Sequence, residues 1–175
     1  MNRRRVLTAI AGLGLTGGSL WAVQQNVLSG GNGLPVRVET LDAPGSQAGH
    51  ARVPRPGTPT VIDLFATWCV PCEKQMEALG TVHGEYGDRV QFVSVTNERV
   101  GGSLSRDDVR SWWRSHDGAW TVGLDPESDL MSALGADGLP YLAVADAAGR
   151  VRWTHTGVAD AAALRHQLDG VLGES

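Results

Sequence analysis

The chain has 175 residues, of which 42% are hydrophobic, and a formal net charge of −4 at pH 7. This amount of apolar material predicts one compact domain with a short appendage rather than two full domains. Because no basic run occurs beyond the N-terminus, the composition gives no indication of nucleic-acid binding.

The first residues have the layout of an export signal. Arg3–Arg5 precede Val6–Leu20, a stretch without charge that is rich in glycine. A basic start before a short uncharged segment is typical of export signals, and consecutive arginines before two apolar residues resemble a twin-arginine signal. The alternative, a buried N-terminal helix, is disfavoured by the glycines. Because Ser19–Ala22 lacks the small residues of a usual cleavage site, residues 1–23 are expected to be an export signal or a membrane anchor.

The folded unit is predicted to begin near Pro35. Residues 24–34 are polar and glycine-rich, which is typical of a linker, so the domain is assigned to residues 35–175. Val36–Leu41 alternates apolar and polar side chains in the manner of a half-buried strand. The Pro/Gly-rich segment Asp42–Pro59 is then expected to cross the surface without regular structure.

The central part of the chain alternates predicted strands and helices. Thr60–Phe65 is a short apolar run that suits a strand buried on both faces, interrupted by one charge at Asp63. Helical spacing predicts a helix from Cys69 to about Tyr86, and Gln91–Thr96 reads as another strand. Ser105 is a good N-cap followed by acids, so a helix is expected over Ser105–Ser115.

The last third continues the same alternation. Asp125-Pro126 indicates the start of a helix that stops at Gly135. Periodic apolar residues predict the remaining elements. They are strands at Thr121–Leu124, Tyr141–Ala145 and Val151–Thr156 and helices at Glu127–Leu134 and Ala159–Leu172. The order predicts an α/β fold around a mixed sheet.

Trp112 and Trp113 are adjacent on a predicted helix and are not expected to face the core together, which leaves one of them exposed or half-buried.

The two cysteines carry the chemistry that the sequence suggests. Cys69 and Cys72 are the only cysteines, so any intramolecular disulfide joins them. A helix N-terminus favours a thiolate, which predicts an exposed nucleophile at Cys69, with Cys72 resolving the bond to a partner. Zinc binding is the alternative for a Cys-x-x-Cys pair, but it needs further ligands, and the five histidines are scattered. Redox chemistry is therefore favoured over a metal site.

The segment from Asp63 to Cys72 resembles the active-site segment of the thioredoxin superfamily. Gly138-Leu139-Pro140, with the strand and turn that follow, resembles the cis-proline loop of that superfamily. An additional strand and helix within Gln91–Ser115 is similar to the exported TlpA/ResA-like subgroup. The resemblance covers Val36–Leu172 and implies a thioredoxin-like α/β fold, with a mixed central sheet flanked by helices and an inserted strand–helix element.

The resemblance also implies roles for individual residues. Catalytic roles fall to the two cysteines and to Asp63, a buried acid that accepts a proton from Cys72; a solvated, idle aspartate is the alternative. Trp68 is expected to pack beside the site and shield the sulfurs, or to be an ordinary core aromatic. Pro140 is expected to have a cis peptide bond, although a trans-proline would look the same in sequence. The substrate-binding residues implied are Trp68, Pro71, Leu139 and Pro140. The redox-active disulfide serves in place of a cofactor, and no metal is expected.

Two positions depart from the subgroup. Members devoted to cytochrome c maturation commonly have a glutamate where this chain has Gln75, and the usual Met-Pro is absent at Met76-Glu77. Glu73 places negative charge near the thiols, which favours a reductant over an oxidant.

The resulting hypothesis is an extracytoplasmic thiol:disulfide oxidoreductase, membrane-anchored or secreted. Its expected partners are protein clients and a membrane electron donor, with membrane contact through the N-terminal segment and no nucleic acid. An oxidase or isomerase, a cytochrome c maturation reductant and a non-catalytic peptide-binding module are the alternatives. A peroxidase is disfavoured because Trp68, and not a threonine, precedes Cys69.

Overall fold

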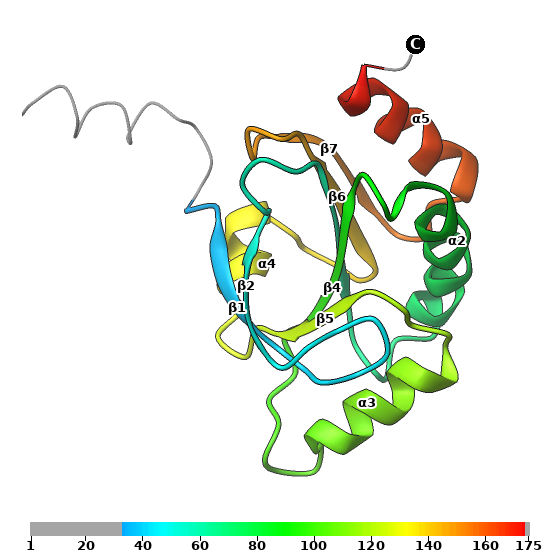
Figure 1. The fold of residues 1–175 in the computed structure, drawn as a ribbon. Helices are drawn as coiled ribbons and strands as arrows, with labels where there is room; N and C mark the ends of the chain where they lie inside the picture. The colour runs from blue at the N-terminus through cyan, green and yellow to red at the C-terminus, as the bar shows by residue number, and fades with distance from the viewer. Residues whose placement is uncertain (1–32, 174–175) are drawn as a thin grey trace, which may run out of the picture. The chain divides into compact units, whose positions relative to one another are not determined.

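The computed structural model describes residues 33–173, which form a seven-stranded mixed sheet with helices on both faces (Figure 1). The strands are β1 (Val36–Thr40), β2 (Gly49–Val53), β3 (Thr60–Phe65), β4 (Gln91–Thr96), β5 (Thr121–Leu124), β6 (Tyr141–Ala145) and β7 (Val151–Thr156), and the helices are α2 (Val70–Tyr86), α3 (Arg106–Ser115), α4 (Asp129–Leu134) and α5 (Ala161–Leu172). This architecture confirms the predicted mixed sheet flanked by helices. The expected export signal and all but the end of the linker lie outside the described residues. Within 33–173, no helix has the length and apolar character needed to cross a membrane.

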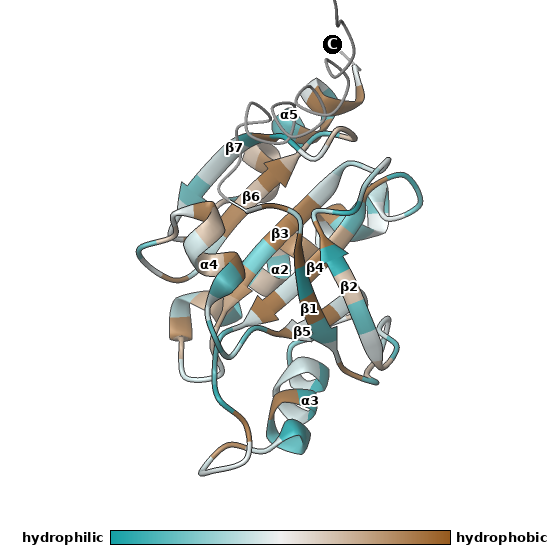
Figure 2. Cartoon of the chain, turned by 90° about the vertical axis from the view of Figure 1, so that its left-hand side faces the viewer, coloured by the Kyte–Doolittle hydropathy of each residue, from teal (hydrophilic) through white to brown (hydrophobic). Residues whose placement is uncertain are grey.

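Strand β3 lies inside the sheet, whose strand order is β2-β1-β5-β4-β3-β6-β7. It pairs in parallel with β4 and antiparallel with β6, and all six of its residues are buried. A strand covered on both faces must be apolar at nearly every position, and Figure 2 shows hydrophobic residues concentrated along the inner strands. The one charged residue in the strand is Asp63, the fourth residue of β3.

Side chains alternate between the two faces of β3, and each face has its own core. Val61 and Phe65 join the larger core, which α2, α3 and α5 complete. Ile62 and Leu64 join the smaller core, to which α4 contributes Leu130. The larger core contains both cysteines, so the sheet positions the start of α2 over the face to which residues 61, 63 and 65 point.

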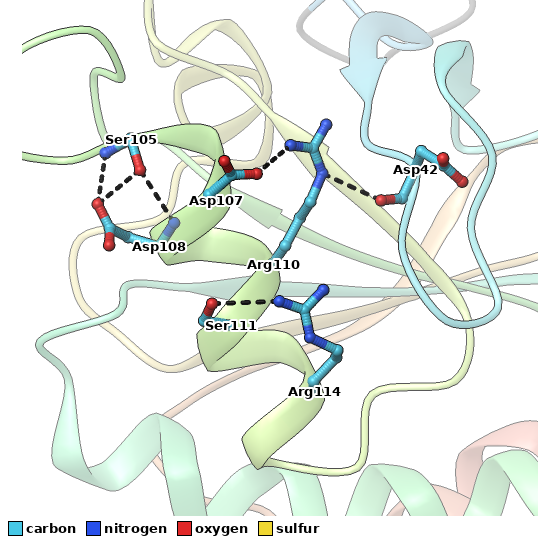
Figure 3. A network of polar contacts seen from close by, with 7 residues as sticks. All are labelled: Asp42, Ser105, Asp107, Asp108, Arg110, Ser111 and Arg114. Carbon is cyan, nitrogen blue, oxygen red and sulfur yellow. Dashed lines mark hydrogen bonds and ion pairs between the residues drawn. The ribbon is translucent and has the colours of Figure 1, made fainter.

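Helix α3 is fixed at its N-terminus and along one side by polar contacts (Figure 3). Ser105 and Asp108 form a capping box, in which each side chain accepts a hydrogen bond from the other's backbone N–H. Arg110 donates to the backbone carbonyl of Asp42 at 3.0 Å and pairs with Asp107 at 2.7 Å. The loop after β1 is thereby held against the helix.

The structure corrects the prediction that one of the two adjacent tryptophans is exposed or half-buried. Trp113 is fully buried and Trp112 is 9% exposed. The Trp112 ring stacks on Phe65 with the centroids 4.7 Å apart, while the indole N–H of Trp113 donates to the carbonyl of Pro44 at 3.0 Å. Both neighbouring residues therefore join the same core, where Trp113 also packs against Phe65 and Trp120.

Several elements differ from the sequence-based expectations. The segment Asp42–Pro59, expected to be irregular, contains the edge strand β2, which pairs antiparallel with β1. Helix α4 begins later than predicted, yet Asp125 still caps it by accepting the backbone N–H groups of residues 129, 130 and 131. Helix α5 begins at Ala161 because Asp160 is its N-cap and accepts from the N–H of Ala163.

Candidate functional site

The two cysteines form a disulfide at the start of α2, immediately after β3. Cys69 is the N-cap of the helix, and Pro71 lies in its first turn, where a missing N–H is harmless. The N–H of Cys69 donates to the carbonyl of Ala66 at 3.1 Å, and the N–H of Cys72 donates to that of Cys69 at 3.0 Å. Strand end, tight turn and first helical turn thus hold both sulfurs at the positive end of the helix dipole.

The exposure of the site differs from two expectations. Cys69 is only 4% exposed, against 1% for Cys72, so the predicted exposed nucleophile is nearly as buried as its partner while the disulfide is formed. Trp68 does not pack as a shield, because it is 72% exposed. Val70 and Pro71 are also exposed. The disulfide therefore lies beneath a rim of projecting apolar side chains.

Asp63 lies under this site, on the same face of β3 as Val61 and Phe65, which pack in one cluster with Cys69 and Cys72. The residue is 2% exposed, which excludes the alternative of a solvated aspartate. Burial raises the pKa of Asp63 to about 7, and a hydrogen bond from Ser94 acts in the opposite direction. A carboxyl group with this pKa exchanges a proton readily at neutral pH.

The carboxyl group is held on one side only. Ser94 Oγ donates to Asp63 Oδ2 at 2.7 Å, and Trp120 Nε1 donates to the same Oγ at 2.9 Å. The other oxygen, Oδ1, is buried and has no hydrogen-bond partner in the structure. Sequence reasoning did not identify Ser94 or Trp120 as part of the site.

Glu98 fixes the turn before Cys69. Its carboxylate accepts from the backbone N–H of Thr67 at 2.7 Å, from the Thr67 hydroxyl at 2.9 Å and from the Thr96 hydroxyl at 3.0 Å. These bonds link the ends of the parallel strands β3 and β4. Glu98 was also missed from the sequence, although an acid two residues after a buried strand is the kind of signal that marks a functional strand end.

The connection between β7 and α5 bridges two parts of the site. The Leu139–Pro140 peptide bond is cis, and the N–H of Gly157 donates to the carbonyl of Pro140 at 2.8 Å. Two residues later, the Ala159 N–H donates to Gln75 Oε1 at 2.8 Å, and Gln75 Nε2 donates to the Ala159 carbonyl at 3.2 Å. Gln75 has no exposed surface. It therefore joins the cysteine helix to this connection.

Charge near the disulfide is limited. Glu73 lies in the first turn of α2, with its Oε2 3.9 Å from Nε2 of His116. Within residues 33–173, no group of three or more His, Cys, Asp or Glu side chains is arranged to hold a metal ion. The arrangement brings together a disulfide, a buried acid beneath it and a cis-proline loop joined to the cysteine helix.

Comparisons with known proteins agree with this geometry. A family model described as Redoxin matches residues 31–172. Thiol:disulfide interchange protein DsbE of Escherichia coli K12 is 30% identical over 129 residues, which cover 71% of this chain and 65% of that relative's length. Among solved structures, StoA from Bacillus subtilis has a TM-score of 0.63 at 19% identity, covering 77% of this chain and 98% of its own. The thioredoxin-like superfamily protein SPOA0173 has a TM-score of 0.66 at 19% identity, with coverage of 81% and 97%. The two structures establish the fold as thioredoxin-like.

Proposed function

Because this chain belongs to the Redoxin family, we propose that it is a thiol:disulfide oxidoreductase in which Cys69 and Cys72 exchange a disulfide with protein clients. The observation that carries the proposal is the Cys69–Cys72 disulfide at a helix N-terminus, with the buried Asp63 on the sheet beneath it. Glu73 in the first turn favours the reducing direction, because negative charge near the sulfurs opposes a very stable thiolate.

In the proposed reaction the dithiol form reduces a client disulfide. The Cys69 thiolate attacks one client sulfur, the client S–S bond breaks, and a mixed disulfide forms while the first client thiolate leaves. Cys72 then loses its proton to Asp63 and attacks the Cys69 sulfur, which releases the second client thiolate. Two electrons pass to the client, and the protein is left with the Cys69–Cys72 disulfide. A membrane donor of two electrons is proposed to restore the dithiol.

Client segments are proposed to bind across the apolar rim and the cis-proline loop. Trp68 and Pro71 project beside the disulfide, which suits contact with apolar client side chains. The backbone of Leu139, next to the cis bond of Pro140, is proposed to pair with the extended client chain. Gln75 places no carboxylate at its buried position, where members devoted to cytochrome c maturation commonly have a glutamate. The proposed activity is therefore general disulfide exchange.

The proposed location is extracytoplasmic, with residues 1–23 as export signal or membrane anchor, 24–34 as linker and 35–175 as the catalytic domain. The basic residues Arg3–Arg5 before an uncharged stretch support this assignment. Replacing Arg3 and Arg4 by lysine should retain precursor in the cytoplasm. Undiminished export of that variant would contradict the twin-arginine part of the proposal.

Trapping variants test the enzyme assignment. Cys72→Ser should form mixed disulfides with clients through Cys69, because the chain has no other thiol to resolve them. Cys69→Ser should trap none. Both variants are expressed with their N-terminal segment, quenched with acid, alkylated and compared on non-reducing gels. Complexes formed through Cys72, or by neither variant, would overturn the assignment.

The reduction potential of the Cys69–Cys72 pair tests the direction of electron flow. A value of about −270 mV supports a reductant, and a value of about −120 mV supports an oxidant.

A further inference from the structure

While Asp63 is ionised, the hydrogen bonds around it have one direction, because a carboxylate only accepts. An indole N–H is a donor and never an acceptor, so Trp120 must donate to Ser94 Oγ across their 2.9 Å separation. Ser94 has a single hydroxyl proton, and its Oγ lies 2.7 Å from Asp63 Oδ2. The Ser94 oxygen accepts from Trp120, and its proton points to Oδ2 because the ionised carboxylate cannot donate.

This direction determines where a proton can sit on Asp63. If Oδ2 carried the proton, Oδ2–H would face a hydroxyl that is itself donating toward it, and Ser94 would need another acceptor. Oδ1 is buried and has no hydrogen-bond partner, so it is free to take a proton without breaking the existing bonds. Asp63 and the disulfide-bonded Cys72 contact the same core on this face of the sheet.

We propose that Ser94, oriented by Trp120, is a positioning residue that reserves Oδ1 of Asp63 for the proton taken from Cys72. This inference rests on the proposed function, because it needs Asp63 to act as the proton acceptor during resolution. Ser94 stabilises the carboxylate through Oδ2, and Trp120 acts only through Ser94. The pair thereby sets the pH at which Asp63 becomes available as a base.

Few other groups act on this carboxyl. In β6 the residue opposite Asp63 is the uncharged Leu142. Helix α2 contributes the cysteines and Glu73 in its first turn. It also contributes His83, whose ring packs against Trp120 with the centroids 5.2 Å apart. Burial lowers the pKa of His83, which favours its neutral form. The bond from Ser94 is thus the polar contact that favours the ionised form of Asp63.

The test follows the two steps separately in the full-length reduced protein. The protein is mixed with one equivalent of 5,5′-dithiobis(2-nitrobenzoate). Cys69 releases the first thiolate of the reagent and Cys72 releases the second, so stopped-flow absorbance separates attack from resolution. Ser94→Ala removes the bond to Oδ2, which should raise the proton affinity of Asp63 about ten-fold. The pH midpoint of the second phase should rise by about one pH unit, and its rate at pH 7 should fall about five-fold. The first phase should keep its pH profile.

Trp120→Phe keeps an aromatic ring but removes the N–H, so it should move the midpoint in the same direction by less. Added to Ser94→Ala, it should cause no further shift, because its effect passes through the hydroxyl. Trp113→Phe is the matched control, since the Trp113 N–H donates to Pro44 instead. Infrared spectroscopy gives a second readout: the carbonyl band of protonated Asp63 should move to higher frequency in Ser94→Ala and be absent in Asp63→Asn.

Separate outcomes test the role of Asp63 and the positioning role of Ser94. If Asp63→Asn leaves the second phase unchanged at every pH, Asp63 is not the proton acceptor and the proposed mechanism fails at that point. If Asp63→Asn slows the second phase but Ser94→Ala leaves its midpoint in place, the positioning role alone is refuted. A shift caused by Ser94→Ala that persists in the Asp63→Asn background would also refute it.

Discussion

Replacing Gln75 by glutamate should make the stability of the fold depend on pH. Gln75 is fully buried and forms two hydrogen bonds with the backbone of Ala159, one as donor and one as acceptor. A protonated glutamate can make both bonds, since its hydroxyl donates and its carbonyl accepts. An ionised glutamate has no proton to donate, so it leaves the Ala159 carbonyl facing a buried negative charge.

The magnitude follows from the burial. A fully buried carboxyl without a cation commonly binds its proton a hundred- to a thousand-fold more tightly than in water. Its pKa in the folded state is then above the unfolded value, so the folded state holds a proton that the unfolded state has released. Stability is retained below the unfolded pKa and lost as the pH rises through the folded pKa. We expect Gln75→Glu to lose about 2.5–4 kcal/mol relative to wild type between pH 4 and pH 8.

Urea unfolding of the oxidised proteins at pH 4 and pH 8 measures this loss. With a slope of about 2 kcal/mol per molar urea, the midpoint difference between variant and wild type should widen by about 1.2–2 M across this range. Gln75→Met, which has no titratable group, is the control and should show a loss that does not change with pH. An equal loss for Gln75→Glu at both pH values would refute the reasoning.

Three further changes test other parts of the structure by urea unfolding. Asp63→Asn should stabilise the protein by up to about 4 kcal/mol at pH 8 but not at pH 4, because burial raises the pKa of Asp63 to about 7 and the ionised form is disfavoured in the folded state; a pH-independent effect would contradict this. Gly118→Ala should cost about 1–3 kcal/mol, since the new Cβ would overlap the Trp113 indole, and an unchanged midpoint would show that the ring can move. Asp125→Ala should cost about 1–2 kcal/mol through loss of the α4 cap, with no loss if water replaces the carboxylate.

The sequence was sufficient where periodicity and burial coincide. Thr60–Phe65, Gln91–Thr96 and Tyr141–Ala145 were predicted with the bounds that the structure has, because inner strands need nearly continuous apolar residues. Strand β2 was missed because only Val53 of its five residues is buried. An edge strand held by one neighbour has little apolar pattern to show, and a Pro/Gly-rich setting conceals it further.

Contacts between distant segments explain the other errors. Adjacency on a helix limits how many neighbours can face one surface, but Trp112 and Trp113 both pack against Phe65, and the carbonyl of Pro44 accepts the Trp113 N–H. In the sequence, Gln75 is only a difference from the related subgroup at one position. Its structural role depends on hydrogen bonds to Ala159, 84 residues later. Such roles become visible only when the partner segment is placed.

The pairing of Asp63 with Ser94 shows how the register of the sheet determines the site. Each is the fourth residue of its strand, and parallel pairing brings the first residue of β3 opposite the first residue of β4, so Asp63 faces Ser94. Both apolar strands are therefore interrupted at the same level. A slip of one residue would place Val93 or Val95 beside Asp63 and turn the serine to the opposite face. The buried acid would then lose its hydrogen-bond donor while remaining buried, which would raise its proton affinity further. The register of β3 and β4 thus sets the protonation of Asp63, as well as the packing of the core.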